Sequence, residues 1–365
     1  MRAAGAVVGP ASPDRRQRPA RRWAVVGETR KRRSRPDRRP RPPPRSGDVA
    51  SGPVTFAFTL TGVLINCRAH HRFRSMTTVR IGVMYDRDWA PEGLPGFARE
   101  AEALGVDDLW VVEDLGWNGG VSAAAVALGA TERLRVGIGI TPAPLRSPAL
   151  LAMELATLAR VFPGRLVAGI GHGVREWMVA VGAAPRSPLA LLEETIGSVR
   201  ALLRGERVEL EGREVRLDGV RLVHPPVEPP PVVAGVVRPR SLELSGRVAD
   251  GTVIAEGHGP REVESARALA GKGGAGPGHT LTVLAFCCVG DDPQQAEETL
   301  RPQVEGQAAW LGRPAEQVFT VSGRAGEAAD RIRELAAAGA DTVVLRVAGA
   351  EPLQQLGRVL RALGR

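Results

Sequence analysis

Two neighbouring carboxylates, Glu113 and Asp114, end the apolar run DDLWVVED and are candidates for acid–base chemistry. A carboxylate held beside a reacting group can give or take the proton that the transition state requires. Successive side chains of a strand point to opposite faces, so we expect at most one of the pair to face a site. The alternative for either residue is structural, as a helix cap or as an ion-pair partner of Arg146.

A glycine-rich turn ends another apolar run, in the stretch GRLVAGIGHGVREW. Gly169, Gly171 and Gly173 alternate there, and a glycine inside a strand costs about 0.5–1 kcal/mol relative to alanine. Such a cost usually reflects a close approach of the backbone to another group. Val174 stands where the dinucleotide fingerprint G-x-G-x-x-G needs its third glycine, so the turn predicts a backbone site for a flat or anionic ligand. The alternative is that Gly169 only makes room for a bulky neighbour.

Two further turns contain residues suited to holding a ligand. The turn 235–239 carries Arg238, and Ser241 is placed to cap the following helix, which predicts a second cradle for an anion. Arg238 could instead be a solvated residue at the start of that helix. The proline-bracketed segment 141–146 predicts a rigid loop that can back a planar ring.

Eight short apolar runs, separated by segments with the apolar spacing of helices, position these turns. Parallel strands that are buried on both faces are apolar at consecutive positions, and barrel enzymes build their sites from the loops after such strands. The pattern predicts an α/β fold, a (β/α)8 TIM barrel, with a β-hairpin insertion at 207–222 and an extra helical excursion at 291–320. Ser147 and Pro148 predict the start of the helix after the third strand. The predicted strands are 79–85, 107–114, 134–140, 165–171, 231–237, 251–257, 280–290 and 341–347.

Residues 1–75 form a basic, Arg/Pro-rich head that differs in composition from the rest of the chain. They carry a net charge of +14, whereas the whole chain carries +9, so residues 76–365 carry −5. Sequence of this kind, without apolar periodicity, predicts a disordered head. The head could be translated sequence upstream of Met76, or an arm that binds RNA or a membrane surface. The acidic remainder, the predicted barrel, is not expected to bind nucleic acid.

The sequence predicts neither a metal site nor a membrane span. Cys67, Cys287 and Cys288 lack the spacing of a disulfide framework or of a metal-ligand set, which indicates a reducing, cytoplasmic location. The apolar segment 52–67 is shorter than the roughly 20 residues that a membrane helix needs.

The order and spacing of several segments resemble the bacterial luciferase-like monooxygenase superfamily, in the branch that depends on coenzyme F420 and includes methylenetetrahydromethanopterin reductase. The similarity runs from about Val79 to Leu363. It is carried by GVDDLWVVEDL, TERLRVGIGITPAPLRSPALLAMELATLARVFPGRLVAGIGHGVREWMVAVG, LLEETIGSVRALLRGERVELEGREVRL and PVVAGVVRPRSLELSGRVADG. The resemblance implies a TIM barrel that binds a flavin or a 5-deazaflavin at the mouth where the strands end.

The resemblance also implies where the cofactor is held. A bulged, often cis peptide that backs the ring would fall near Ile140 and Thr141, with Arg146 close to the ring system. The phosphate would be held by the backbone of two turns, which comprise Gly171, His172 and Gly173 in the first and Gly235, Val236, Val237 and Arg238 in the second.

Two motifs depart from the relatives. Many relatives read SDH after the second strand, with the histidine near the reacting carbon, and this chain has Val112, Glu113 and Asp114 there. Likewise, the segment 146–148 reads RSP where many relatives read RHP. Because Asp114 takes the place of the histidine, we assign the chemistry to Asp114 and a structural role to Glu113. A carboxylate with its reference pKa of about 4 would need burial or a like charge to serve near neutral pH.

The expected function is that of an oxidoreductase which exchanges a hydride between coenzyme F420 and a small organic substrate. Two alternatives stay open, an FMN-dependent monooxygenase and a flavin- or deazaflavin-binding barrel without turnover. The expected partner is a small molecule, and a homodimer is an open alternative to a monomer.

Overall fold

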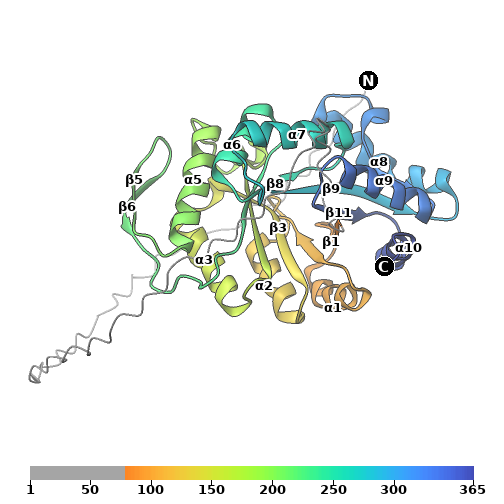
Figure 1. The fold of residues 1–365 in the computed structure, drawn as a ribbon, viewed down its shortest axis with the longest axis horizontal. Coiled ribbons are helices and arrows are strands. Elements are labelled where there is room, and N and C mark those ends of the chain that lie inside the picture. Colours follow the sequence, from red (N-terminus) through yellow and green to blue (C-terminus); the bar gives the residue numbers. More distant parts are fainter. Residues whose placement is uncertain (1–78) are drawn as a thin grey trace, which may run out of the picture. The chain divides into compact units, whose positions relative to one another are not determined.

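The computed structural model describes residues 79–365, in which eight parallel strands close into a barrel (Figure 1). The ring is complete because β8 pairs with β7 and β9, and β1 pairs with β2 and β11. All eight predicted strands are present, which confirms the (β/α)8 TIM barrel; the predicted head, residues 1–75, lies outside the described residues. The barrel strands are β1 (Arg80–Met84), β2 (Asp108–Val111), β3 (Arg135–Pro142), β4 (Leu166–Gly171), β7 (Val232–Gly235), β8 (Gly251–Ile254), β9 (Thr280–Val289) and β11 (Thr342–Val347).

Helices follow the strands and cover the outside of the barrel (Figure 1). The predicted start of α3 is confirmed, because the Ser147 side chain accepts a hydrogen bond from the Leu150 amide at 3.2 Å and Pro148 opens the helix. The helices are α1 (Leu94–Leu104), α2 (Gly120–Ala130), α3 (Pro148–Val161), α4 (Arg175–Ala180), α5 (Pro188–Leu203), α6 (Pro239–Val248), α7 (Pro260–Lys272), α8 (Pro293–Leu311), α9 (Ala325–Ala337) and α10 (Pro352–Ala362). Short 3-10 turns occupy Pro91–Gly93, Ala143–Leu145 and Ala315–Gln317.

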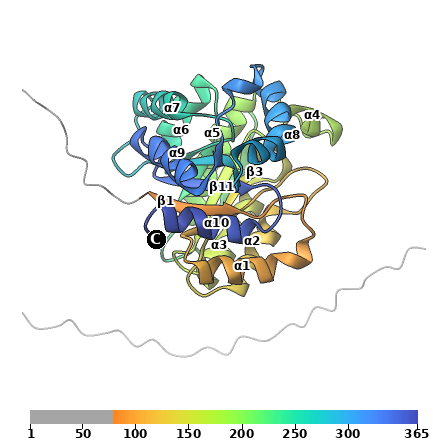
Figure 2. The same ribbon diagram turned by 90° about the vertical axis from the view of Figure 1, so that its right-hand side faces the viewer.

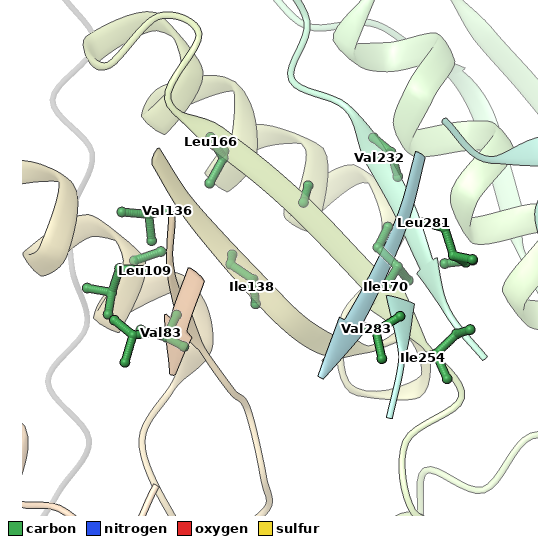
Figure 3. Packing of buried hydrophobic residues seen from close by; sticks show 14 of the residues in the cluster. Val83, Leu109, Val136, Ile138, Leu166, Ile170, Val232, Ile254, Leu281 and Val283 are labelled. Carbon is green, nitrogen blue, oxygen red and sulfur yellow. The ribbon is translucent and has the colours of Figure 1, made fainter. Parts of the chain in front are cut away.

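Alternating strand residues form two separate cores. One set packs outward against the helices, and Figure 3 shows part of it, including Val83, Leu109, Ile138 and Ile170. The other set fills the barrel interior and consists of Met84, Trp110, Val167, Val233, Val253, Leu284 and Val344. Because both faces of each strand are buried, the strands are apolar at consecutive positions, and this is why their sequence signal was strong.

Two additions to the minimal barrel also match the sequence. The hairpin β5 (Val208–Glu211) and β6 (Arg216–Val220) stands outside α5 (Figure 1). The predicted helical excursion contains α8, which leads into a short strand, β10 (Val321–Gly323), that the sequence analysis missed. β10 pairs with the last three residues of β9, beyond the residues of β9 that pair with β8. In Figure 2, α10 and α1 lie side by side next to β1.

Candidate active site

The end of β3 is irregular and lies at the mouth of the barrel, where the carboxyl ends of the strands meet. Its pairing with β4 shifts register between Ile138 and Thr141, and the Gly139–Ile140 peptide is cis. The Thr141 hydroxyl donates to the carbonyl of Gly169 at 3.0 Å and is buried, so it anchors the bulge to β4. The bulge therefore falls at the residues that the resemblance implied.

The glycines of β4 and β7 form a platform beneath the Ile140 side chain. A methyl group on Gly171 would lie 2.9 Å from the Ile140 side chain and 2.9 Å from the carbonyl oxygen of Gly235. The three atoms nearest to a methyl group on Gly235 would all belong to the Ile140 side chain, and a methyl group on Gly169 would collide with the carbonyl of Ile138. These glycines thus make room for the bulged strand, which supports the alternative reading of Gly169 and extends it to Gly171 and Gly235. Ile140 itself is half-buried and forms part of the surface of the mouth.

Gly173 has a different reason to be glycine. Its φ is +69°, a conformation that L side chains rarely adopt, and a methyl group there would lie 3.0 Å from the Pro142 side chain. The residue is needed for the backbone path from β4 into α4. A substitution at Gly173 would therefore disturb folding as well as any ligand.

A hydrogen bond between His172 and Ser241 joins the turn after β4 to the helix after β7. The His172 Nε2 atom lies 3.0 Å from the Ser241 hydroxyl, and burial lowers the pKa of this histidine. The sequence analysis placed Ser241 as the cap of α6, which is wrong: the N-cap is Arg238, and Ser241 sits inside the first turn. The two predicted anion-binding turns are therefore neighbours in space, held together by a side-chain contact that sequence spacing did not reveal.

The turn after β7 leaves backbone donors at the start of α6. No side chain caps this helix, so the first N–H groups of α6 are without intrahelical acceptors. Arg238 and Arg240 are exposed beside them. Val236 differs from the prediction, because its side chain is buried in the outer core and its amide donates to the carbonyl of Val253 at 3.1 Å. The predicted anion cradle is thus reduced to Val237, Arg238 and the first turn of α6.

Glu113 belongs to an ion-pair network outside the barrel ring. Its carboxylate accepts a hydrogen bond from the Gly120 amide at 2.7 Å and binds both terminal nitrogens of Arg146. The Nε atom of Arg146 lies 3.1 Å from Glu154, so this guanidinium is held between two carboxylates. Their hydrogen bonds and charges outweigh the effect of burial and raise the pKa of Arg146. These contacts correspond to the structural alternative for Glu113, in which it caps a helix and pairs with Arg146. They also hold the Arg146 side chain between Glu113 and Glu154.

Asp114 faces the mouth and is paired with an arginine from the neighbouring strand. One carboxylate oxygen, Oδ2, accepts a hydrogen bond from Arg87, which follows β1. Arg87 also stacks over the ring of Trp117 at 4.5 Å, and the Trp117 indole donates to Asp88 at 2.9 Å. The Asp114 side chain keeps 26% of its surface exposed, so a ligand can reach it. Residues 86–88 were not identified from the sequence, because no local pattern marks them.

Arg346, near the end of β11, forms a second charged cluster at the mouth. It donates to Asp86 at 2.7 Å, lies 3.7 Å from Glu256, and stacks over Phe286 at 5.7 Å. Burial disfavours the charged form of Asp86 and raises its pKa. The hydrogen bond from Arg346 and the positive charge of Arg346 outweigh burial, so the pKa of Asp86 lies below its ordinary value. The sequence analysis missed this cluster because Asp86 and Arg346 are 260 residues apart in the chain.

The mouth therefore has two chemically different sides. The glycine half, which we define as the ends of β3, β4 and β7, presents backbone, Ile140 and the anion cradle. The charged half, which we define as the ends of β8, β9, β11, β1 and β2, presents carboxylate–arginine pairs and Phe286. Below them, Trp110 fills the interior against Gly137 and Gly139. Trp110 thus closes the floor of the site.

The residues that the structure describes show no other obvious reactive centre. Within 79–365, no group of three or more His, Cys, Asp or Glu side chains is arranged to hold a metal ion. In the same residues, no helix has both the length and the apolar character needed to cross a membrane. Cys287 and Cys288 are buried free thiols, and burial raises the pKa of both.

Comparisons with known proteins agree with this geometry. The chain is 28% identical over 212 residues to a 5,10-methylenetetrahydromethanopterin reductase of Methanolobus tindarius, covering 57% of this chain and 64% of that protein. It is 33% identical over 184 residues to an F420-dependent glucose-6-phosphate dehydrogenase of Nakamurella multipartita, covering 47% of this chain and 54% of that protein. The matched region thus spans little more than half of these relatives.

Solved structures share the fold at low sequence identity. An F420-dependent secondary alcohol dehydrogenase in complex with an F420-acetone adduct superposes with a TM-score of 0.70 at 20% identity, over 78% of this chain and 99% of that one. The oxygenating constituent of 3,6-diketocamphane monooxygenase from Pseudomonas putida, in complex with FMN, gives 0.62 at 16% identity, over 77% and 96%. The model of the luciferase-like monooxygenase family matches residues 71–350, which is most of the chain. With the bulged barrel described above, this match shows that the chain belongs to the luciferase-like monooxygenase family.

Proposed function

We propose that this protein is a coenzyme F420-dependent oxidoreductase that exchanges a hydride between the deazaflavin and a small organic substrate at the mouth of the barrel. The observation that carries the proposal is the glycine half, where the bulge at Ile140 rests on Gly171 and Gly235 beside an open anion cradle. A flat ring can lie against the bulge while its anionic side chain reaches the first turn of α6. The relatives whose names state a dependence on F420 support the choice of cofactor.

The residues present fit such a cofactor on two independent grounds. A methyl group on Gly171 or Gly235 would collide with Ile140, so these glycines let the bulge keep its place at the surface of the mouth, where a flat ring would bind. In addition, the Nδ1 atom of His172 is buried without a hydrogen-bond partner among the described residues, in the turn that the His172–Ser241 contact joins to α6. Arg238 adds positive charge at the rim.

Bound deazaflavin would supply a carbon centre that accepts or donates a hydride, and the protein would provide orientation and one proton. Asp114 is the residue we place at that proton. Its Oδ2 atom is fixed by Arg87, while Oδ1 forms no hydrogen bond with the described residues. In the oxidation of an alcohol, the Asp114 carboxylate would accept the hydroxyl proton while the hydride passes from the substrate carbon to the bound cofactor and a carbonyl forms. Trp110 is buried below the mouth and Ile140 is half-buried at its surface, so both side chains exclude water from the parts of the site that they line.

Titration of the purified protein with F420 and with FMN tests the proposal. We expect F420 to bind with a change in its fluorescence, and Arg238→Ala to raise the dissociation constant about 10- to 100-fold, since a charge-assisted contact contributes about 1.5–3 kcal/mol. Arg204→Ala is the matched control, because Arg204 is also exposed but pairs with Glu206 at the C-terminal end of α5. If F420 does not bind, the proposed function is wrong. If Arg238→Ala and Arg204→Ala bind F420 equally strongly, the cradle at Arg238 does not hold the cofactor.

An FMN-dependent monooxygenase is the second candidate. It is favoured by the likeness of the fold to an FMN-bound monooxygenase and by the family to which the chain belongs. Tight binding of FMN with weak binding of F420, together with consumption of oxygen on addition of reduced FMN, would establish this alternative.

A further inference from the structure

The charged half of the mouth has more carboxylates than arginines. Asp86, Asp88, Asp114 and Glu256 face Arg87 and Arg346, which leaves two negative charges uncompensated. Asp88 belongs to this group because it accepts a hydrogen bond from the Trp117 indole, and because its charge is among those that raise the pKa of Arg346. The side chains of Asp86, Glu256 and Arg346 are each less than one fifth exposed, so solvent screens these charges less than it screens surface charges.

Neither arginine in this half is available for an anionic substrate. Arg346 is bound by Asp86 through two nitrogens, at 2.7 Å and 3.4 Å, and its third nitrogen lies 3.7 Å from Glu256. The hydrogen bonds that Arg346 donates to Asp86 and the charges of both carboxylates outweigh burial and raise the pKa of Arg346, so it stays a cation within this cluster. Arg87 is held between Asp114 and the face of Trp117. A phosphate or carboxylate that approached either arginine would have to displace a carboxylate already in place.

The glycine half has the opposite character. Arg238 and Arg240 are exposed at its rim, next to the unpaired N–H groups of α6. An anionic cofactor is therefore attracted to the β7 side, and the space that it leaves for the substrate adjoins the negative side. The polarity of the mouth separates the two ligands by charge.

We infer that the substrate site is selective for uncharged or cationic molecules and rejects phosphorylated or carboxylated ones, through the excess carboxylates around Arg346. This inference rests on the proposed function, because it needs the cofactor on the glycine half. It distinguishes the chain from the relative whose name specifies glucose 6-phosphate, an anion. The carboxylates that set this preference are Asp86, Asp88 and Glu256. Asp114 adds a further negative charge and is also the residue to which we assign proton transfer.

Collisional quenching of bound F420 by probes of different charge tests the inference. Iodide, neutral acrylamide and caesium ions are added to the F420 complex and to free F420, and each quenching constant for the complex is divided by that for free F420. The two excess negative charges should lower the ratio for iodide about threefold below that for acrylamide, and raise the ratio for caesium. Similar ratios for all three probes would overturn the inference.

A single-charge variant makes the test specific to this cluster. Glu256→Gln should raise the iodide ratio about 1.5- to 2-fold, because Asp86 continues to hold Arg346 by the closer contact. Glu193→Gln is the matched control, since Glu193 pairs with Arg247 on the outer helices, and it should leave the ratio unchanged. If Glu256→Gln does not fold, Asp88→Asn replaces it, and a smaller rise in the iodide ratio is then expected because solvent screens this exposed charge more strongly.

The two ideas fail in different ways. If F420 does not bind at all, the proposed function is wrong and the inference falls with it. If F420 binds and iodide quenches it as well as acrylamide does, or the Glu256→Gln ratio equals that of the wild type, only the charge selectivity is wrong.

Discussion

The contact between Gly235 and Ile140 predicts that substitutions at these two positions depend strongly on each other. A methyl group on Gly235 would come closer than 3.0 Å to a methyl group of Ile140, and its three nearest atoms would all belong to the Ile140 side chain. Overpacking of this kind costs about 1–3 kcal/mol of unfolding free energy. Gly235→Ala should therefore destabilise the wild-type protein by that amount. In the Ile140→Ala variant, which lacks the colliding atoms, Gly235→Ala should lower the unfolding free energy only slightly.

The neighbouring glycines provide a graded series for the same experiment. Gly171→Ala should be relieved only in part by Ile140→Ala, because the carbonyl oxygen of Gly235 still lies 2.9 Å from the new methyl group. Gly169→Ala should not be relieved at all, because its methyl group meets the backbone carbonyl of Ile138. Urea unfolding of the single and double variants gives each coupling energy, with expected values of about 1–3 kcal/mol for Gly235 and below about 0.5 kcal/mol for Gly169.

One control and one result decide whether the reasoning holds. Gly197→Ala, within α5, has no neighbour within 4 Å of the new methyl group and should be neutral or stabilising. Gly171 and Gly235 are not among the glycines with positive φ, so backbone conformation does not forbid alanine there. Equal costs for Gly235→Ala with and without Ile140 would refute the platform as the reason for these glycines.

Three further outcomes follow from the site and its electrostatics. Asp114→Asn should slow turnover about 10²- to 10⁴-fold with little change in the Kd of the cofactor, and full activity would remove Asp114 from the mechanism. Glu113→Gln should instead lower the unfolding free energy by about 1–3 kcal/mol, measured by urea unfolding, because it weakens charged hydrogen bonds to Arg146. Burial lowers the pKa of His172, His258 and His279 below 6.5, so the unfolded state takes up protons first as the pH falls. Stability should thus decrease between pH 6.5 and about pH 5, by up to about 1.4 kcal/mol per pH unit for each histidine, and an equal or higher Tm at pH 5.5 than at pH 7.5 would contradict this.

The elements could be predicted from the sequence because their signals are local. Consecutive apolar residues marked the eight strands, and Ser147 followed by Pro148 marked the start of α3. β10 was missed because Val321–Gly323 is too short to show a pattern. Ser241 was misplaced as a cap because its partner, His172, lies 69 residues away.

The site was only partly predictable, because its chemistry depends on pairs that the fold brings together. The bulge near Ile140 and the two turns were expected from the resemblance, but the reason for the glycines was not. Their neighbour is the Ile140 side chain on the adjacent strand, which sequence alone does not place. In the same way, Asp86 and Arg346 carry no local motif and become a cluster only when β1 pairs with β11.

The pairing of β1 with β11 also has a consequence for how the chain is made. Arg80–Val83 lie beside Thr342–Leu345, so the ring can close only after nearly all of the barrel sequence has left the ribosome. Until then β1 has an unpaired edge, and exposed edges of apolar strands invite association between chains. Contacts between such distant segments also form slowly. We therefore expect the nascent chain to depend on protection of this edge, and β11 to be the strand whose arrival ends that period.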